Sequence, residues 1–322
     1  MREPGPISEK ITLGISSCLL GEKVRFDGGH KLDHYLKDTL GAYVSWLPVC
    51  PEVETGFPVP REAMRLVGDS SFPRLVTVRS GVDHTDRMRS WAKRKLGEIE
   101  KHDLCGFIFK ARSPSSGLRG VKVYGASGVP IHAGVGIFAR MFMERFPFVP
   151  VEDEGRLHDP ALRENFIERI FVFRRWREMN RSGPTIDELI SFHTEHKLLV
   201  LAHSPKHYML LGRLVADAKK RERHALLEEY FALLMDGLKL LATTRKNTNV
   251  LQHIAGYFKK QLSPEEKQEL TDMILTYHKG FVPLIVPLVL INHYVNKYDE
   301  SYLKRQYYLH PHPIELMLRN HV

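Results

Sequence analysis

The first half of the chain alternates short apolar runs with helical patterns. Apolar runs of strand length, rich in β-branched and aromatic residues, occur at Ile11–Ser17, Ala42–Val49, Leu75–Val78 and Gly106–Phe109. Between and after them, apolar residues recur with helical spacing at Lys31–Leu40, Asp83–Lys101 and Gly134–Phe146. This alternation predicts an α/β domain, with a Rossmann-like parallel sheet and helices on its faces.

The second half carries helical patterns almost without strands. They cover Asp159–Asn180, Ile186–Leu201, Lys206–Ala216, Glu222–Ala242, Lys246–Gln261, Pro264–Lys279 and Val282–Val295. Two of them have clear start signals: Thr185 with Glu188 forms a capping box, and Ser263 precedes Pro264 and two glutamates. We therefore expect an all-α helical domain.

The two halves are joined by a segment with loop composition. Residues 146–155 contain two prolines and an acidic group of residues, which is typical of a linker. We expect an α/β domain at residues 1–150 and a helical domain at 151–322.

Composition adds the broad class of protein. With 322 residues, 43% hydrophobic and 26% charged, the chain is typical of a two-domain globular protein and unlike a collagen-like or disordered one. No stretch reaches the ~20 apolar residues of a membrane span. The apolar run that follows the charged segment Met1–Lys10 continues into polar Gly21, which favours a buried strand over a lipoprotein signal. We expect a cytoplasmic protein without membrane contact.

Three polar motifs each follow an expected strand directly. They are Ser16–Gly21, Val49–Glu52 and Lys110–Gly117. Ligands of open parallel sheets bind outside the carboxyl ends of the strands, so the three motifs are expected to meet at one cleft.

Cys18 and Cys50 bring two thiols to that cleft. Three cysteines, an odd and small number, indicate cytosolic thiols or metal ligands rather than disulfides. Thiolates suit iron–sulfur or zinc sites, and Glu52 lies where it can act as an acid or base beside a metal. The alternative is that both cysteines are small buried residues of the core.

The same motifs carry a family resemblance. Residues 10–145 resemble the thiouracil desulfurase (TudS-type) domain, through SSCLLG with Cys18, VRFDG with Arg25 and Asp27, CPE with Glu52, PRE with Arg61, and KARSPSSG with Lys110 and Ser113. Residues 157–320 resemble the YbgA-type helical domain of unknown function, through FHTEHK, AHSP, NVLQH, GYFK, PLIVP and the tail HPHPIEL.

The resemblance implies a chemistry and a set of roles. It implies a 4Fe–4S cluster on three cysteines, whose open iron acts as a Lewis acid on a thiocarbonyl sulfur while a carboxylate activates water. No net electron transfer is required. By resemblance, Glu52 handles protons, Ser113 positions the substrate, and Arg25, Asp27, Arg61 and Lys110 contact it. The substrate is a thiolated uracil, as the free base, a nucleotide or a tRNA residue.

The chain departs from the family at residue 116. The family's third cysteine corresponds to Ser116, and Cys105 precedes the strand Gly106–Phe109, so it is expected at the opposite end of the sheet. Three readings stay open: Ser116 is a metal ligand as an alkoxide; water or another side chain fills the position of a labile cluster; or the cluster is lost and the fold binds its ligand without this chemistry.

Basic residues favour anionic partners. The formal net charge is +9, and Arg25, Arg61, Lys110 and Arg112 flank the three motifs. We expect a cleft suited to a nucleotide or thiolated tRNA, unless ion pairs with Asp27, Glu54 or Glu62 neutralise these cations.

Other basic and histidine-rich patterns are more simply explained by structural roles. Basic stripes around Trp91 and Trp176 are typical of RNA-binding surfaces, but more often of solvated helix faces over a buried Trp. His193, His196, His203 and His207 have spacings compatible with zinc, although capping and buried polar roles are the expectation. Two further functions therefore remain: a nucleic-acid-binding or regulatory module that has lost the cluster, and a zinc hydrolase using Cys18, Cys50 and Glu52.

Overall fold

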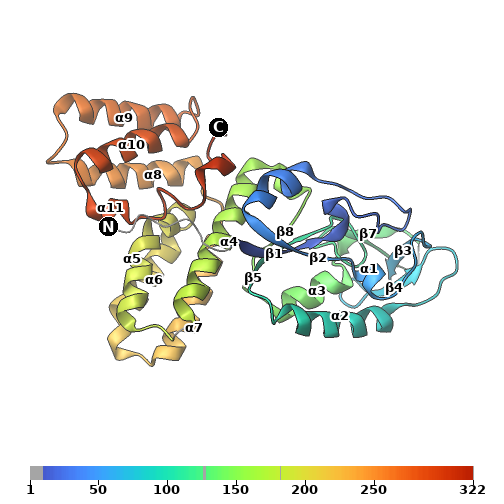
Figure 1. Cartoon of the computed structure of the whole chain (residues 1–322). Coiled ribbons are helices and arrows are strands. Elements are labelled where there is room, and N and C mark those ends of the chain that lie inside the picture. The colour runs from blue at the N-terminus through green and yellow to red at the C-terminus, as the bar shows by residue number, and fades with distance from the viewer. Residues whose placement is uncertain (1–9, 126–127, 182, 322) are drawn as a thin grey trace. The chain divides into compact units, whose positions relative to one another are not determined.

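The computed structural model divides into two compact units, Met1–Asp159 and Pro160–Val322, and describes residues 10–125, 128–181 and 183–321 (Figure 1). Residues 1–9, part of the charged segment at the N-terminus, lie outside the described residues. The division falls later than the expected boundary after residue 150. The reason is that the expected linker contains a short strand, β8 (Val151–Asp153), which pairs with β5 (Leu104–Phe109) of the first unit.

The first unit contains the expected parallel sheet. Its strand order is β2-β1-β5-β8, where β1 spans Ile11–Ser16 and β2 spans Val44–Val49, and every neighbouring pair is parallel. All six residues of β5 are buried, as are all but one of β1. The fold class expected from the sequence is confirmed for this unit.

A second sheet was not expected. It has the order β4-β3-β6-β7, formed by β3 (Met64–Val67), β4 (Arg74–Thr77), β6 (Val121–Tyr124) and β7 (Pro130–Gly134). The run Leu75–Val78, which we expected in the parallel sheet, lies here, antiparallel to β3. Only a short loop separates β3 from β4, and such a connection makes a hairpin but not the long crossover that parallel strands need.

One expected helix of the first half is wrong. In place of a helix over Lys31–Leu40, the chain makes a π turn at Tyr35–Thr39 and a 3-10 turn at Leu40–Ala42. Only Leu36 and Leu40 of this stretch are buried, so the apolar face is too short to stabilise a longer helix.

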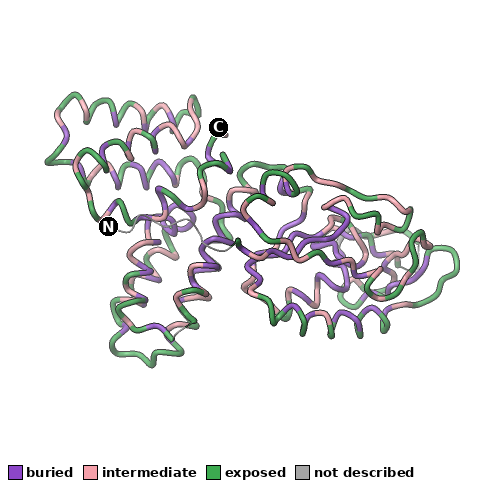
Figure 2. The backbone as a smooth tube through the Cα atoms, viewed as in Figure 1, coloured by how far each residue is buried: buried purple, intermediate pink, exposed green. Residues whose placement is uncertain are grey.

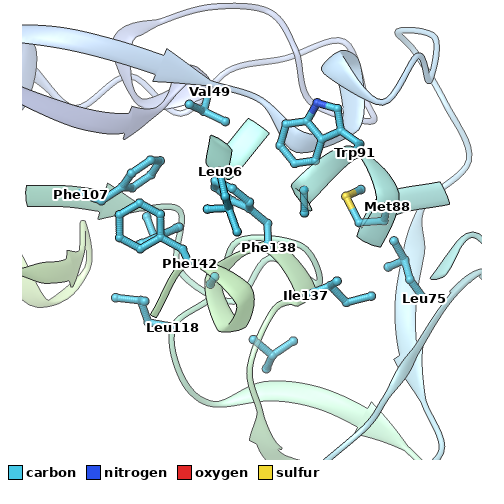
Figure 3. Close-up of a cluster of buried hydrophobic side chains, with 14 of the residues drawn as sticks. Val49, Leu75, Met88, Trp91, Leu96, Phe107, Leu118, Ile137, Phe138 and Phe142 are labelled. Carbon is cyan, nitrogen blue, oxygen red and sulfur yellow. The ribbon is translucent and has the colours of Figure 1, made fainter. Parts of the chain in front are cut away.

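Aromatic side chains dominate the core of the first unit. Two helices, α2 (Thr85–Ile99) and α3 (Ile137–Arg145), pack their apolar faces on the strands. The rings of Phe107 and Phe109 on β5 stack with centroids 4.1 Å apart, and the Phe142 ring of α3 lies 5.0 Å from that of Phe107. In Figure 3, Phe107, Phe138, Phe142 and Trp91 point into the same apolar space.

The second unit is helical, as expected. Its α-helices are α4 (Pro160–Asn180), α5 (Ile186–His203), α6 (Pro205–Ala216), α7 (Arg223–Leu238), α8 (Thr244–Ala255), α9 (Pro264–His278), α10 (Ile285–Lys297) and α11 (Ser301–Lys304). The expected capping box of Thr185 with Glu188 is confirmed. Ser263 is the N-cap of α9, as expected, and also forms a capping box with Glu266. Buried and exposed positions alternate along α8, as in an amphipathic helix (Figure 2). Among the described residues, no helix is long and apolar enough to cross a bilayer.

The central position of Phe107 gives a stability prediction. Phe107→Ala should lower the free energy of unfolding of the first unit by about 3–5 kcal/mol, because it leaves a cavity beside the buried rings of Phe109, Phe138 and Phe142. Urea unfolding measures the loss, followed by the fluorescence of Trp91 in chains where Trp46 and Trp176 are replaced by Phe. Phe72, which is 76% exposed, provides the matched control: Phe72→Ala should change stability by less than about 0.5 kcal/mol. Equal effects of the two substitutions would contradict this account of the core.

Candidate functional site

The three polar motifs meet at the carboxyl edge of the parallel sheet. The last residues of β1 and β2, Ser16 and Val49, lie opposite each other, and β5 runs parallel beside β1. The loops that follow these strands therefore start from one edge. The backbone N–H of Lys110, directly after β5, donates to Ser16 Oγ at 2.9 Å, which ties two of the loops together.

A pocket of about 360 Å³ opens at this edge. The sequence-predicted residues that line it are Cys18, Arg25, Cys50, Glu52, Arg61, Lys110, Ser113 and Ser116. The geometric expectation of one cleft is thus met, while the role of each residue stays a prediction. Among the described residues, Asp27 is not one of those that line the pocket. Its carboxylate accepts from the backbone N–H of Gly29 at 3.0 Å and from the Arg25 guanidinium at 3.4 Å.

The two cysteines are held by tight turns after their strands. Cys18 lies in the 3-10 turn Ser17–Leu20 and is 7% exposed. Gly21 ends that turn with a φ of 98°, a conformation that favours glycine. Cys50 precedes the short helix α1 (Pro51–Glu54), and its backbone N–H donates to Glu54 Oε1 at 3.0 Å.

Both thiols are held in the protonated form. Burial raises the pKa of Cys18 to about 11, against the opposing charges of Lys110 and Arg25. Burial, followed by the negative charge of Glu52, raises the pKa of Cys50 to about 12. Neither thiol is therefore an activated nucleophile at neutral pH, because the thiolate is the reactive form.

The loop after β5 is clamped by the start of α3. The backbone N–H groups of Ile137 and Phe138 donate to the carbonyl oxygens of Pro114 and Ser115 at 3.2 and 2.9 Å. Gly136 permits this approach, since a Cβ there would lie 2.5 Å from the Ser115 carbonyl carbon and oxygen. The clamp buries Ser115 and Ser116 completely or nearly so, at 0% and 3% exposure.

Glu52 is the centre of the polar network in the pocket. Ser115 Oγ donates to Glu52 Oε1 at 2.6 Å, and the Cys50 thiol lies 3.7 Å from Oε2. The guanidinium of Arg61 is 3.8 Å from the same oxygen. Ser113 Oγ, in turn, lies 3.0 Å from Ser115 Oγ. The carboxylate thus has fixed partners on both oxygens and is positioned to accept or deliver a proton.

Sequence reasoning missed Ser115 and Glu154. Ser115 is part of the motif KARSPSSG, but only its neighbours Ser113 and Ser116 were expected to have a role there. Glu154 lies in the segment expected as a linker; it forms an ion pair with Lys110 and accepts from the backbone N–H of Ala111 at 2.6 Å. Lys110 is therefore neutralised by a partner that the sequence did not indicate.

The positive charge of the pocket is distributed differently from the expectation. Lys110 is paired with Glu154 and Arg61 lies beside Glu52, whereas Lys31 and Arg112 also line the pocket and have no carboxylate partner among the described residues. Arg61 Nε is buried and has no hydrogen-bond partner in the described part of the chain. These cations remain available to an anionic or carbonyl-bearing ligand.

The third cysteine lies away from the pocket, as expected. Cys105 is completely buried near the start of β5, and its thiol donates to the Asp103 carbonyl oxygen at 3.5 Å. The chain has three cysteines, so the pocket offers two thiols and the hydroxyl of Ser116. This donor set does not fit a cluster held by three thiolates, because an alkoxide oxygen is a poor ligand for soft iron–sulfur centres.

The histidines and basic stripes take structural roles. Within the described residues, His193, His196, His203 and His207 do not gather as metal ligands. His193 bonds to Tyr230, His196 to the Phe192 carbonyl, His203 to Glu168 and His207 to its capping residue Ser204. Trp91 and Trp176 are both buried. The basic residues around Trp91 are mostly exposed, as expected for a solvated helix face. The stripe around Trp176 differs from that expectation, because Arg169 and Arg174 are buried.

Comparisons with known proteins agree with the two resemblances. Residues 13–154 match the family described as 2-thiouracil desulfurase, and residues 197–313 match a family described as a protein of unknown function, DUF1722. The chain is 33% identical over 156 residues to the uncharacterized protein YbgA of Escherichia coli (strain K12), which covers 47% of this chain and 90% of YbgA.

Two further proteins are similar to part of the chain. The chain is 28% identical over 108 residues to the uncharacterized protein YbbK of Bacillus subtilis (strain 168), covering 32% of this chain and 71% of YbbK. Among solved structures, the 4Fe-4S-dependent thiouracil desulfidase TudS is 34% identical, covers 49% of this chain and 98% of its own, and has a TM-score of 0.39.

The burial of the two pocket thiols predicts slow alkylation. At about pH 8, Cys18 and Cys50 should react with iodoacetamide about a hundredfold or more slowly than the same cysteines in the urea-unfolded chain, because raised pKa values leave little thiolate. The rates should rise with pH through at least about pH 10. Peptide mass spectrometry measures each site. Rapid labelling of either thiol at neutral pH would show that the neighbouring cations outweigh burial.

Proposed function

We propose a function from the premise that this chain belongs to the 2-thiouracil desulfurase family in its N-terminal unit and to the DUF1722 family in its C-terminal unit. The N-terminal pocket binds a thiolated uracil and replaces its thiocarbonyl sulfur with oxygen from water. The observation that carries this proposal is the placement of Glu52, with both carboxylate oxygens held, in the same pocket as Cys18 and Cys50.

The replacement of sulfur by oxygen requires proton transfers but no net electron transfer. Water adds to the thiocarbonyl carbon as Glu52 accepts one of its protons, and Glu52 then returns this proton to the sulfur. The carbon–sulfur bond breaks, the sulfur leaves as hydrosulfide, and the remaining hydroxyl proton is released to solvent as the carbonyl forms. Ser115, which donates to one oxygen of Glu52, keeps the carboxylate turned toward the pocket. The unpartnered Nε of Arg61 supplies a donor for the remaining carbonyl of the base.

The substrate class follows from the unpaired cations. Lys31 and Arg112 line the pocket without a carboxylate partner among the described residues, and Arg25 faces only the half-exposed Asp27. A neutral free base uses none of these charges, whereas a phosphate uses them directly. We therefore favour a thiolated uracil nucleotide, free or as part of a tRNA, over the free base.

The ligands available for a cofactor are the feature in which this chain differs from TudS. TudS is named as a 4Fe-4S-dependent enzyme. Here Cys18 and Cys50 provide two thiols, and the third position is Ser116, so no step of the reaction is assigned to a cluster. If a cluster assembles in this pocket, Ser116 or water completes its ligands.

A second candidate function is favoured by the same departure. A site with protonated thiols and a serine in place of a cysteine suits a domain that binds a thiolated nucleotide without converting it. Such a cluster-free module would act in binding or regulation. The two candidates share the pocket and differ in whether sulfide is released.

Replacement of Glu52 tests its proton-transfer role. Glu52→Gln should slow sulfide release from 2-thiouridine monophosphate by about 10²–10⁴-fold while the affinity for the nucleotide changes little, because the amide keeps the shape but cannot take a proton. Sulfide assays and equilibrium dialysis measure the two effects. Glu98→Gln, at an exposed position of α2, is the control and should retain the parent rate. An unchanged rate in Glu52→Gln would remove this residue from the mechanism.

Replacement of Ser116 separates the two candidate functions. After anaerobic reconstitution with iron and sulfide, Ser116→Cys should bind about four iron atoms per chain, and wild type and Ser116→Ala should bind much less. Iron analysis and visible absorption measure this. If wild type nevertheless releases sulfide, the enzyme reading holds; if only Ser116→Cys does, wild type is the binding module. A complete cluster in wild type would contradict the misfit of the donor set.

A further inference from the structure

Three potential metal ligands converge in the second unit, outside the pocket described above. They are Glu164 and Glu168 of α4 and His312 of the C-terminal tail, and one donor atom from each lies within 4.8 Å of the other two. The two glutamates are one helical turn apart and share a face of α4. None of these residues has a part in the proposed desulfurization.

One ring nitrogen of His312, Nε2, lacks a hydrogen-bond partner among the described residues. His312 Nδ1 lies 3.1 Å from the carbonyl oxygen of Pro313, which can only accept, so the ring proton is on Nδ1. Nε2 then carries a lone pair. It is shielded from solvent and has no hydrogen-bond partner among the described residues. A buried acceptor close to two carboxylates is costly unless a cation lies between them.

Arg319 does not supply the missing donor. Its Nε donates to Glu164 Oε1 at 3.0 Å, its Nη2 to Glu168 Oε1 at 2.8 Å and its Nη1 to the Tyr308 carbonyl oxygen at 2.6 Å. The guanidinium therefore neutralises part of the carboxylate charge and fixes the orientation of both glutamates. It leaves the His312 lone pair without a partner.

The surroundings resemble the outer shell of a metal site. His203, completely buried, lies with Nε2 2.9 Å from Glu168 Oε2, an interaction of the kind that orients ligating carboxylates. Glu164 and Glu168 also border a cavity of about 280 Å³, which the first residues of α8 and Tyr277 line. An ion bound by the carboxylates would have access to this cavity.

We propose that Glu164, Glu168 and His312 bind a divalent first-row transition metal ion, with coordination positions open toward the adjacent cavity. One imidazole and two carboxylates suit Zn²⁺, Mn²⁺ or Fe²⁺, in contrast to the thiol pocket of the first unit, which suits softer centres. With Arg319 beside the two carboxylates, the loaded site carries a net positive charge. It therefore favours an anionic ligand or hydroxide in the cavity.

Manganese is the probe that separates this site from the cysteines, because Mn²⁺ prefers oxygen and nitrogen ligands. The full chain is stripped with a chelator and titrated with Mn²⁺, and the free ion is followed by electron paramagnetic resonance. We expect one Mn²⁺ per chain in wild type and in the Cys18→Ser/Cys50→Ser double variant. Addition of Zn²⁺ should displace it, as the order of divalent affinities predicts.

Variants of the tail and of α4 decide the assignment. His312→Ala should weaken Mn²⁺ binding about tenfold or more, whereas His310→Ala, in the same tail, should bind as wild type. If His312→Ala unfolds, as circular dichroism will show, Glu164→Gln replaces it with the same expected loss. Absence of stoichiometric binding in wild type, or equal binding in wild type and the ligand variants, would overturn the proposal and leave a metal-free ion-pair network. Neither result bears on sulfide release, which is measured separately.

Discussion

The parallel pairing of β1 with β2 and with β5 is the constraint on which the candidate site depends. Parallel strands end at the same edge of a sheet, so residues that are far apart in the chain begin their loops side by side. Cys18, Cys50 and Lys110 each follow one of these strands within two residues. A shift of one residue in the pairing of β1 and β2 would turn buried side chains to the opposite face, and the buried run on β1 opposes it.

Backbone packing then decides how accurately the polar groups are placed. The N–H groups at the start of α3 satisfy the carbonyl oxygens of the loop after β5, and Gly136 allows the two segments to touch. Because this loop is fixed at the backbone, Ser115 can hold Glu52 through a hydroxyl of fixed position. A flexible loop would pay conformational entropy for each such hydrogen bond and would position the carboxylate poorly.

Local patterns could be predicted from the sequence, and long-range partners could not. The apolar runs of β1, β2 and β5 and the start signals at Thr185 and Ser263 lie within a few residues, and the structure confirms these strands and helix starts. The second sheet, the Glu154 partner of Lys110 and the convergence of Glu164 with His312 depend on contacts between distant segments. Glu154, Glu164 and His312 are residue types that are ordinary on a charged surface, so only the fold distinguishes these three from the rest.

The chemistry of the first pocket depends on the balance between burial and charge. Burial raises the pKa of Cys18 and of Cys50, and Glu52 adds to the effect on Cys50, so without a metal both sulfurs keep their protons. A metal centre reverses this balance, because it binds thiolates and releases their protons. A metal centre that binds more thiolates compensates more strongly for the effect of burial on their pKa values. Exchange of one sulfur for the oxygen of Ser116 weakens this offset, while the strands, the clamp on the loop and the position of Glu52 stay the same. The fold can therefore persist whether or not the pocket keeps the chemistry of its relatives.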